Sequence, residues 1–191
     1  MSTVRTLSDA ELIQRGARGC KRSFEQFYQR HADALYRYAL VISRQPATAE
    51  EATQDVFVGV LSNADGFDPR RSADARGWLY GLLRNALRQY LTSAGCEPSA
   101  DATTGSRSAE AAATWLEAER GIGRAISVLP LEQREVLVMC ALQNMPYEVA
   151  AQVLGVPVGT VRSRLARART ELKKQFESQE GYAPRELSYE C

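Results

Sequence analysis

The sequence predicts an all-α protein made of two small helical domains that are joined by a flexible linker. No segment of the 191-residue chain shows the strict apolar–polar alternation that is typical of a strand. Several segments instead repeat apolar residues every three to four positions, as amphipathic helices do. Between them, residues 92–113 are rich in small and polar side chains and poor in apolar ones, which predicts a linker.

The composition excludes several classes of protein. Hydrophobic residues make up 45% of the chain and charged residues 25%, as in ordinary globular domains. The four cysteines are scattered and there is one histidine, so neither a metal site nor a disulfide framework is expected. No apolar run reaches the roughly 20 residues that cross a membrane, and MSTVRTLSDAEL lacks a signal-peptide core. We therefore expect a cytoplasmic protein without a cofactor, a metal or a small-molecule substrate.

Three capping-box patterns predict where the first three helices begin. These patterns start at Ser8, Ser23 and Thr48. The second helix should run to Ser43, and Gln45-Pro46 separates it from the third, which should end near Ser62. His31 lies in the apolar stripe of the second helix, so it is interpreted as a histidine at the edge of the core.

The third helix has one small or apolar face and one acidic face. The inner face consists of Ala49, Ala52, Thr53, Val56, Phe57 and Val60. The outer face consists of Glu51, Gln54, Asp55 and Val58. Such a face is often only solvated, but an apolar Val58 beside the acids also suits a contact with another protein.

A turn-rich basic loop precedes the fourth helix. The loop spans residues 63–74 and contains Arg70 and Arg71. The helix is expected over residues 75–91, with Leu79, Leu82, Leu83, Ala86 and Tyr90 facing inward. Trp78, Asn85 and Gln89 share one flank, next to Arg84 and Arg88. An indole, an amide and arginines can hold single-stranded bases by stacking and hydrogen bonds, although Trp78 could instead close the edge of the core.

The C-terminal part predicts a helix-turn-helix. One helix should run from about Trp115 to Val128 and another from Leu131 to Leu142. A short helix then covers Tyr147 to Leu154. Gly155 is placed to end it in the left-handed conformation, and Pro157 is placed to start the next helix.

The last helix has an apolar stripe opposite small and basic residues. The stripe consists of Val161, Leu165, Ala168 and Leu172, and the opposite face of Ser163, Ala166, Arg167, Thr170 and Lys174. Arg162 and Arg169 flank that face on one side and Arg164 on the other. This layout fits a recognition helix in a DNA major groove, where guanidinium groups bind phosphates or guanine edges. The alternative is a basic, solvated helical hairpin.

Two blocks of the chain resemble bacterial RNA polymerase sigma factors of the extracytoplasmic-function group in the sigma-70 family. Residues 24–91, which include AEEATQDVF and GWLYGLLRNAL, resemble conserved region 2. Residues 125–176, which include GTVRSRLARAR, resemble region 4. Together the blocks cover about 120 of the 191 residues. The boundaries implied are region 2 over 1–91, the linker over 92–113, region 4 over 114–176 and an acidic tail over 177–191.

The resemblance implies a non-enzymatic protein that carries core RNA polymerase to promoters. Region 4 would bind the −35 element as duplex through Thr160, Arg162, Ser163, Arg164 and Arg167. Region 2 would bind the melted −10 element through Arg70, Arg71, Trp78, Arg84, Asn85 and Arg88. The clamp of the largest polymerase subunits would be bound by Glu51, Gln54, Asp55 and Val58. An anti-sigma factor is the other expected partner, so the chain should be a monomer when free or a heterodimer with that factor.

Some positions depart from the family pattern. Gln89 stands where an acid is common, and Thr92 and Ser93 stand where basic residues are common, which weakens the expected hold on upstream DNA. Ala166 replaces a bulkier residue, so little direct base contact is expected there. Two alternatives remain open, namely a stand-alone helix-turn-helix regulator and a sigma-like decoy that binds only an anti-sigma factor.

Overall fold

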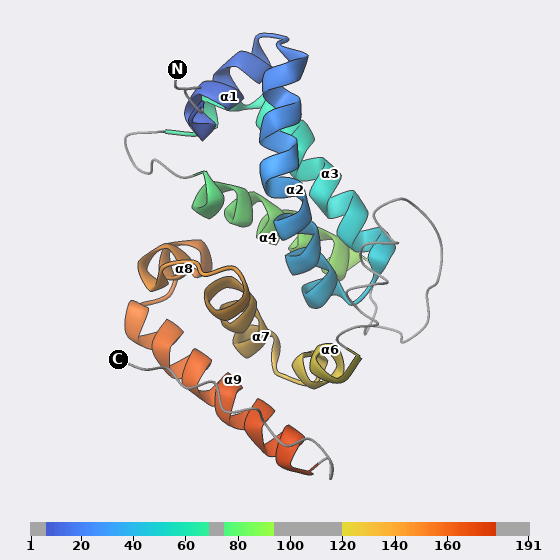
Figure 1. The fold of residues 1–191 in the computed structure, drawn as a ribbon, viewed down its shortest axis with the longest axis vertical. Coiled ribbons are helices and arrows are strands. Elements are labelled where there is room, and N and C mark those ends of the chain that lie inside the picture. The colour runs from blue at the N-terminus through green and yellow to red at the C-terminus, as the bar shows by residue number, and fades with distance from the viewer. Residues whose placement is uncertain (1–6, 69–74, 94–119, 179–191) are drawn as a thin grey trace, which may run out of the picture.

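The described residues of the chain form two groups of helices and no other regular structure. The computed structural model describes residues 7–68, 75–93 and 120–178. The N-terminal group contains α1 (Asp9–Ala17), α2 (Lys21–Ser43), α3 (Pro46–Ser62), the short 3₁₀-helix η1 (Ala64–Gly66) and α4 (Arg76–Ser93). The C-terminal group contains α6 (Arg120–Ser127), α7 (Leu131–Leu137), η2 (Val138–Leu142), α8 (Tyr147–Leu154) and α9 (Val158–Ser178). The all-α prediction with two helical domains is confirmed (Figure 1).

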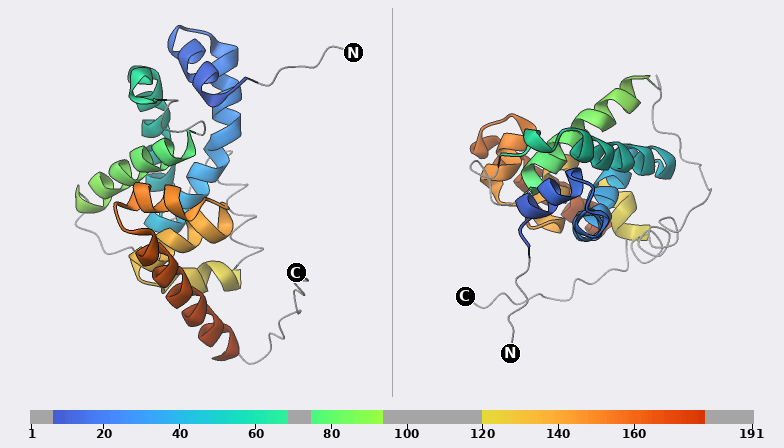
Figure 2. Two further views of the ribbon diagram at one scale, coloured as in Figure 1. Left: turned by 90° about the vertical axis from the view of Figure 1, so that its left-hand side faces the viewer. Right: turned by 90° about the horizontal axis from the view of Figure 1, so that it is seen from above.

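The N-terminal group packs around α2 and α3. These two helices lie against each other, α1 covers the start of α2, and α4 crosses both (Figures 1 and 2). All six residues predicted for the inner face of α3 are buried, and all four predicted for its outer face are exposed. On α4, Leu79 and Leu83 are buried as predicted, whereas Leu82, Ala86 and Tyr90 are only partly buried. Tyr80, which was not predicted, packs edge-on against Tyr38 of α2.

One of the three predicted capping boxes forms. The Ser8 hydroxyl accepts the N–H of Glu11, and the Glu11 carboxylate accepts the N–H of Ser8. The other two predictions were wrong by three residues, because the residues that cap α2 and α3 are Cys20 and Gln45 rather than Ser23 and Thr48. Proline is favoured at the first helical position since its missing N–H has no partner there anyway. Ser23 and Thr48 instead donate within the first turns, to Cys20 Sγ and to the side chain of Gln45.

The C-terminal group matches the predicted order with two changes. The expected helix Leu131–Leu142 is α-helical only to Leu137 and then widens into the π-helical η2, in which the Gln143 N–H reaches the Val138 carbonyl at 3.0 Å. The expected helix from Trp115 begins at Arg120 within the described part, and residues 115–119 lie outside it. α8 has the predicted bounds, and α9 begins one residue after Pro157.

The two groups pack against each other. α8 lies against α4, and α6, α7 and η2 lie against α2, while α9 forms the outer layer (Figure 1). Apolar residues of both groups therefore form one continuous cluster of buried side chains. The arrangement places the recognition-helix candidate on the side of the molecule away from α3 (Figures 1 and 2).

Candidate nucleic-acid interface

The turn between α8 and α9 is fixed by a glycine in the left-handed conformation. Gly155 has φ +68° and ψ +35°. Its N–H bonds the Gln152 carbonyl at 3.3 Å, and the Val156 N–H bonds the Ala151 carbonyl at 3.1 Å. This pair of bonds is the Schellman pattern, which satisfies the last carbonyls of a helix and turns the chain sharply. The predicted role of Gly155 is confirmed, and the turn sets the angle at which α9 leaves α8.

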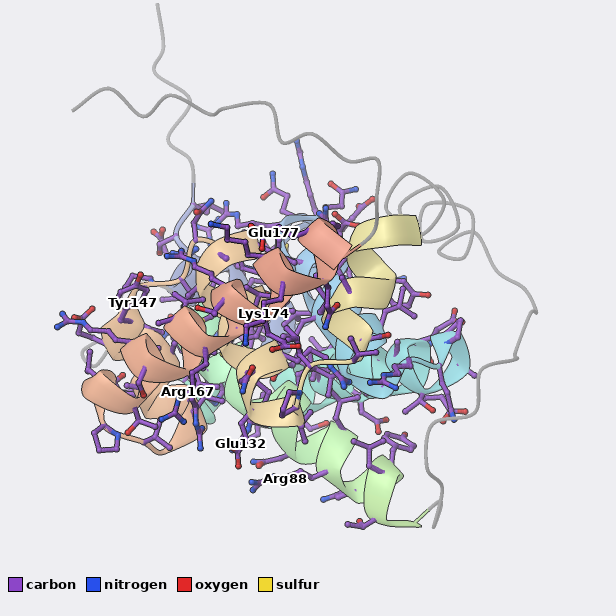
Figure 3. All side chains as sticks on the ribbon, turned by 90° about the horizontal axis from the view of Figure 1, so that it is seen from below. Arg88, Glu132, Tyr147, Arg167, Lys174 and Glu177 are labelled. Atoms are coloured by element: carbon purple, nitrogen blue, oxygen red, sulfur yellow. The ribbon has the colours of Figure 1, made fainter. Side chains whose placement is uncertain are left out.

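α9 presents its basic side to solvent because its apolar side is buried. Val161, Leu165 and Ala168 have at most 3% of their surface exposed, and Leu172 is partly buried. The five residues predicted for the opposite face are all exposed. Figure 3 labels two of them, Arg167 and Lys174. The Ser163 hydroxyl donates to the Thr160 carbonyl at 3.0 Å, so its oxygen still has lone pairs that can accept a hydrogen bond.

The arginines of α9 differ in their partners. Arg162, Arg167 and Arg169 are exposed, and within the described ranges none of them forms an ion pair. Arg164 is only 20% exposed, and its Nη2 lies 3.2 Å from the carboxylate of Glu132 on α7. Arg162 and Arg167 are thus available for a ligand, whereas Arg164 would first exchange an internal partner.

Trp78 and Asn85 of α4 line one cavity. The cavity has a volume of about 550 Å³. The Trp78 ring lies 5.5 Å from the Phe67 ring, measured between centroids, so the indole is held from one side. The structure thus brings together the indole and the amide that the sequence analysis grouped. It also supplies a part of the lining that was not predicted, because Val149, Gln152 and Val153 of α8 border the same cavity.

The basic residues predicted to lie beside Trp78 and Asn85 differ in their exposure and in their partners. Arg88 is exposed, and Figure 3 labels it on α4. Arg84 is 18% exposed, and its Nε donates to Glu135 of α7 at 2.8 Å. Arg70 and Arg71 lie outside the described residues. In this arrangement, Arg84 is engaged by the C-terminal group.

The acidic face of α3 is open and includes one residue that the sequence analysis missed. Glu51, Gln54 and Asp55 are exposed, and the exposed fraction of Val58 is 62%. Leu61, one turn further along, is 40% exposed and extends the apolar part of the face. Its spacing of three residues from Val58 was the signal that could have identified it.

A hydrogen bond fixes one acid on this face. Asp55 accepts the hydroxyl of Tyr90 of α4 at 2.7 Å. This bond, and then the nearby carboxylate charges, raise the pKa of Tyr90 to about 12. The hydrogen bond from Tyr90 therefore orients the Asp55 carboxylate, which remains exposed to solvent.

Two kinds of feature are absent from the described ranges. Residues 7–68, 75–93 and 120–178 contain no group of three or more histidine, cysteine, aspartate or glutamate side chains that could hold a metal ion. No helix in those ranges is both long enough and apolar enough to span a membrane.

Comparison with known families matches both groups of helices. Residues 27–95 match the family model for sigma-70 region 2. Residues 119–172 match the model for sigma-70 region 4. The two matches follow each other in the chain as α2–α4 and α6–α9 do.

Similar curated proteins are sigma factors over nearly their full length. The chain is 34% identical over 167 residues to the ECF RNA polymerase sigma factor SigM of Mycobacterium tuberculosis, which covers 87% of this chain and 84% of that protein. It is 27% identical over 189 residues to the ECF RNA polymerase sigma-E factor of Haemophilus influenzae, covering 90% and 96% of the two chains.

Solved structures have the same fold. CnrH in complex with the cytosolic domain of CnrY superposes with a TM-score of 0.68 at 28% identity, covering 90% of this chain and 99% of CnrH. RpoE of Bartonella quintana, solved with the anti-sigma factor NepR, superposes with a TM-score of 0.67 at 23% identity, covering 83% of this chain and 99% of RpoE.

Proposed function

The chain belongs to the extracytoplasmic-function sigma factors of the sigma-70 family, and we propose that three exposed surfaces divide the work of promoter-directed transcription between them. Sigma factors are not enzymes. They bind core RNA polymerase and direct it to promoters. The assignment of individual residues to each step is argued below from their exposure and their partners.

We assign duplex recognition at the −35 element to α9. The observation that carries this proposal is the pair Arg162 and Arg167, which are exposed and form no ion pair within the described residues, on a helix whose Val161, Leu165 and Ala168 are buried. A helix with this cross-section can enter the major groove and offer guanidinium groups to guanine edges or to phosphates. Ser163 and Thr160 lie at the same end of the helix, where recognition helices contact bases. Arg164 would contribute after leaving Glu132.

We assign the melted −10 element to the cavity beside α4. Trp78 offers a face for base stacking, and Asn85 offers both a donor and an acceptor to a base edge. Arg88 is exposed and can neutralise a phosphate, as Arg84 can once it leaves Glu135. We include Arg70 and Arg71 in this assignment on the basis of the sequence, because they lie outside the described residues.

We assign docking on the polymerase clamp to the outer face of α3. Glu51, Gln54, Asp55 and Val58 are all exposed on one side of a rigid helix whose other side is buried. Val58 and Leu61 place exposed apolar side chains beside these polar ones, and an apolar patch rimmed by polar residues favours a protein contact.

An anti-sigma factor is the regulatory partner that we propose. RpoE, which shares this fold, was solved bound to one. On this proposal the chain is a monomer when free and a heterodimer when held by that factor, and it acts in the cytoplasm, where bacterial RNA polymerase works.

Run-off transcription tests the three assignments together. Core polymerase plus this protein, on promoter DNA from upstream of its own gene, should give a specific transcript. Arg162→Ala and Arg167→Ala should each reduce the transcript about fivefold or more, because a lost guanine contact costs about 1–3 kcal/mol. Asp55→Ala should reduce the amount of transcript by weakening the binding of the chain to polymerase.

Matched variants control for charge and folding. Lys173→Ala removes one exposed cation near the end of the same helix, and Glu25→Ala removes one exposed carboxylate from α2. Both should transcribe normally. Binding to promoter duplex without any polymerase-dependent transcript would instead favour the stand-alone regulator, and the absence of both activities would favour the decoy.

A further inference from the structure

The turn between α1 and α2 concentrates positive charge. Residues 12–24 contain four basic side chains and no acidic one. We name these four residues, Arg15, Arg18, Lys21 and Arg22, the basic corner. All four are exposed, and none of them forms an ion pair within the residues that the structure describes. Such a group of uncompensated cations on one short turn attracts an anionic partner.

The backbone of this turn is held by its own hydrogen bonds. Gly19 has φ +90°, in the left-handed region. Its N–H bonds the Gly16 carbonyl at 2.9 Å, and the Cys20 N–H bonds the Arg15 carbonyl at 2.9 Å. The first turn of α2 contains no acidic residue, so no carboxylate offsets the partial positive charge at this helix end. The basic corner therefore projects from a backbone that needs no reordering when a partner binds.

The basic corner is connected to the proposed −10 surface through α1. This helix contacts η1, and the residues that follow η1, Phe67 and Asp68, line the same cavity as Trp78. The start of α1 lies beside the start of α4, since Asp9 Oδ2 accepts the Ala75 N–H at 3.4 Å. α1 has nine residues and is thus about 14 Å long. A strand that leaves the cavity on this side therefore has only a short distance to the basic corner.

The path of the chain indicates which part of a promoter lies on this side. α4 ends at Ser93, and the chain continues from that end to region 4, to which we assign the upstream −35 element. α1 lies at the opposite end of α4, which therefore faces downstream. In Figures 1 and 2 the turn between α1 and α2 and the helix α9 lie at opposite ends of the molecule. DNA that leaves the cavity in the downstream direction runs toward the basic corner.

We propose that the basic corner binds the phosphates of the non-template single strand directly downstream of the −10 element. Guanidinium and ammonium groups neutralise phosphates without reading the bases, so the contact is independent of sequence. No large apolar side chain is exposed between Gln14 and Arg22, whereas contacts between proteins have an apolar centre. The charge and the lack of apolar surface therefore favour a nucleic acid over an acidic protein. The inference rests on the proposed function, because it adds a second contact to the strand that α4 holds.

Binding of the holoenzyme to forked DNA tests the proposal. Two fluorescein-labelled forks carry the −35 and −10 elements of the run-off promoter. The non-template strand of the short fork ends directly after the −10 element, and that of the long fork continues for about eight nucleotides, which span about 27 Å when stacked. With Arg18→Gln/Arg22→Gln, the holoenzyme should bind the long fork about fivefold more weakly than the unaltered holoenzyme does, because two phosphate contacts are lost. Its binding to the short fork should not change.

Matched variants separate local charge from other effects. Arg37→Gln/Arg44→Gln removes the same charge from the far half of α2 and the residue after it, and should bind both forks normally. Arg18→Lys/Arg22→Lys should keep most of the affinity for the long fork, since a phosphate contact needs only the charge. Titration from about 50 to 200 mM salt should show a slope that is smaller by about 1.4 for the glutamine variant on the long fork, since each phosphate of a single strand contributes about 0.7.

Cross-linking from the turn itself gives a direct measurement. The Cys20 thiol is exposed within the basic corner. Replacing the other three cysteines (Cys96→Ser, Cys140→Ala and Cys191→Ser) leaves Cys20 as the single attachment point for a benzophenone. In the holoenzyme this label should cross-link to the downstream nucleotides of the long fork. The same label on Asp33→Cys, three turns further along α2 in a chain that lacks Cys20, should not.

The outcomes distinguish a failed inference from a failed function. Equal weakening of both forks by Arg18→Gln/Arg22→Gln would mean that the basic corner binds polymerase, and this result would overturn the proposal. Unchanged binding of both forks, or a label on Cys20 that does not reach the downstream strand, would overturn it as well. If the unaltered holoenzyme binds the short fork no better than a fork with a scrambled −10 element, then the proposed function fails and this inference fails with it.

Discussion

Gly155 is the residue on which the orientation of the recognition helix depends. Its φ of +68° lies in the left-handed region, which is costly for residues with a Cβ. Gly155→Ala should therefore lower the free energy of unfolding by about 1–2 kcal/mol. Gly59→Ala is the matched control, because Gly59 lies inside α3 with open space around it, and alanine there should stabilise by up to about 1 kcal/mol. Urea unfolding followed by circular dichroism measures both, and effects of the same sign would contradict this account.

Asp9 is a buried carboxylate that ties α1 to α2. It bonds Arg30 and lies 3.0 Å from His31 Nε2, and its Oδ2 also accepts the Ala75 N–H at 3.4 Å. Burial alone would raise its pKa, but the hydrogen bonds and charges of His31 and Arg30 outweigh burial and hold the pKa of Asp9 below its ordinary 3.8. Because the folded state binds this proton less readily, Asp9 stabilises the fold above about pH 4, and that contribution is lost as the pH falls through the folded pKa.

Asp9→Asn should therefore flatten the acid side of the stability curve. At pH 7 the variant should be less stable by about 1–3 kcal/mol, since charged hydrogen bonds are lost from a buried site. Asp33→Asn is the control, because Asp33 is 65% exposed and pairs only with Arg37 one turn away. Thermal unfolding at intervals from about pH 7 to pH 3 gives the comparison. Parallel curves for Asp9→Asn and the unaltered chain would argue against the ion-pair assignment.

For single residues, the sequence predicts which side chains are buried better than it predicts which side chains they contact. His31 was correctly predicted at the core, but nothing local points to Asp9, which lies 22 positions earlier. Glu135 was not singled out at all, because its partners Arg84 and Tyr38 lie 51 and 97 positions away. Such pairs depend on how helices dock, and helix periodicity carries no information about docking.

For the helices, the periodicity of apolar residues predicted the buried faces more reliably than capping patterns predicted the helix ends. The inner face of α3 and the stripe of α9 were predicted correctly because burial on one side imposes a 3.6-residue period. The starts of α2 and α3 were wrong because Pro46 and the turn at Gly19, with φ +90°, decide them in place of a capping box. The π-helical η2 was missed because an extra residue in one turn leaves no clear signal in the sequence.

A buried cation on α7, Arg134, connects this helix to its neighbours. The guanidinium of Arg134 satisfies carbonyls at the ends of two other helices, and burial lowers the pKa of Arg134 to about 10 without neutralising it at pH 7. Arg134→Met should lower the free energy of unfolding by about 2–4 kcal/mol, because several buried carbonyls lose a charged donor. Arg134→Lys should recover only part of this loss, since an ammonium cannot reach both sets of carbonyls with a planar fork. Urea unfolding at pH 7 measures the free energy of unfolding of both variants. If Arg134→Lys were as stable as the unaltered chain, then only the charge would matter.

The molecule as a whole carries its charge unevenly. Its net charge is +1, yet residues 155–176 contain six basic side chains and one acidic one, while residues 177–191 contain four acids and one arginine. With so little net charge, the long-range attraction of the whole chain to DNA is small, so we expect duplex binding to depend on the local positive charge of α9. On the proposed function, we therefore expect the chain to need polymerase to hold its two DNA-binding surfaces on one promoter.

The free chain should therefore bind promoter duplex weakly and in a strongly salt-dependent way. If α9 neutralises about three or four phosphates, then the logarithm of the binding constant should fall against the logarithm of salt concentration with a slope of about −3. Arg162→Ala and Arg167→Ala should weaken binding by about 1–3 kcal/mol where they contact a base, and should reduce the slope by about 1 where they contact a phosphate. Fluorescence anisotropy of labelled duplex from about 50 to 200 mM salt separates these two roles for each arginine. Tight binding by the isolated chain that does not depend on salt would instead mean that the chain recognises DNA without polymerase. Phosphate contacts make binding sensitive to salt, so such binding would have to come from extensive contacts with bases.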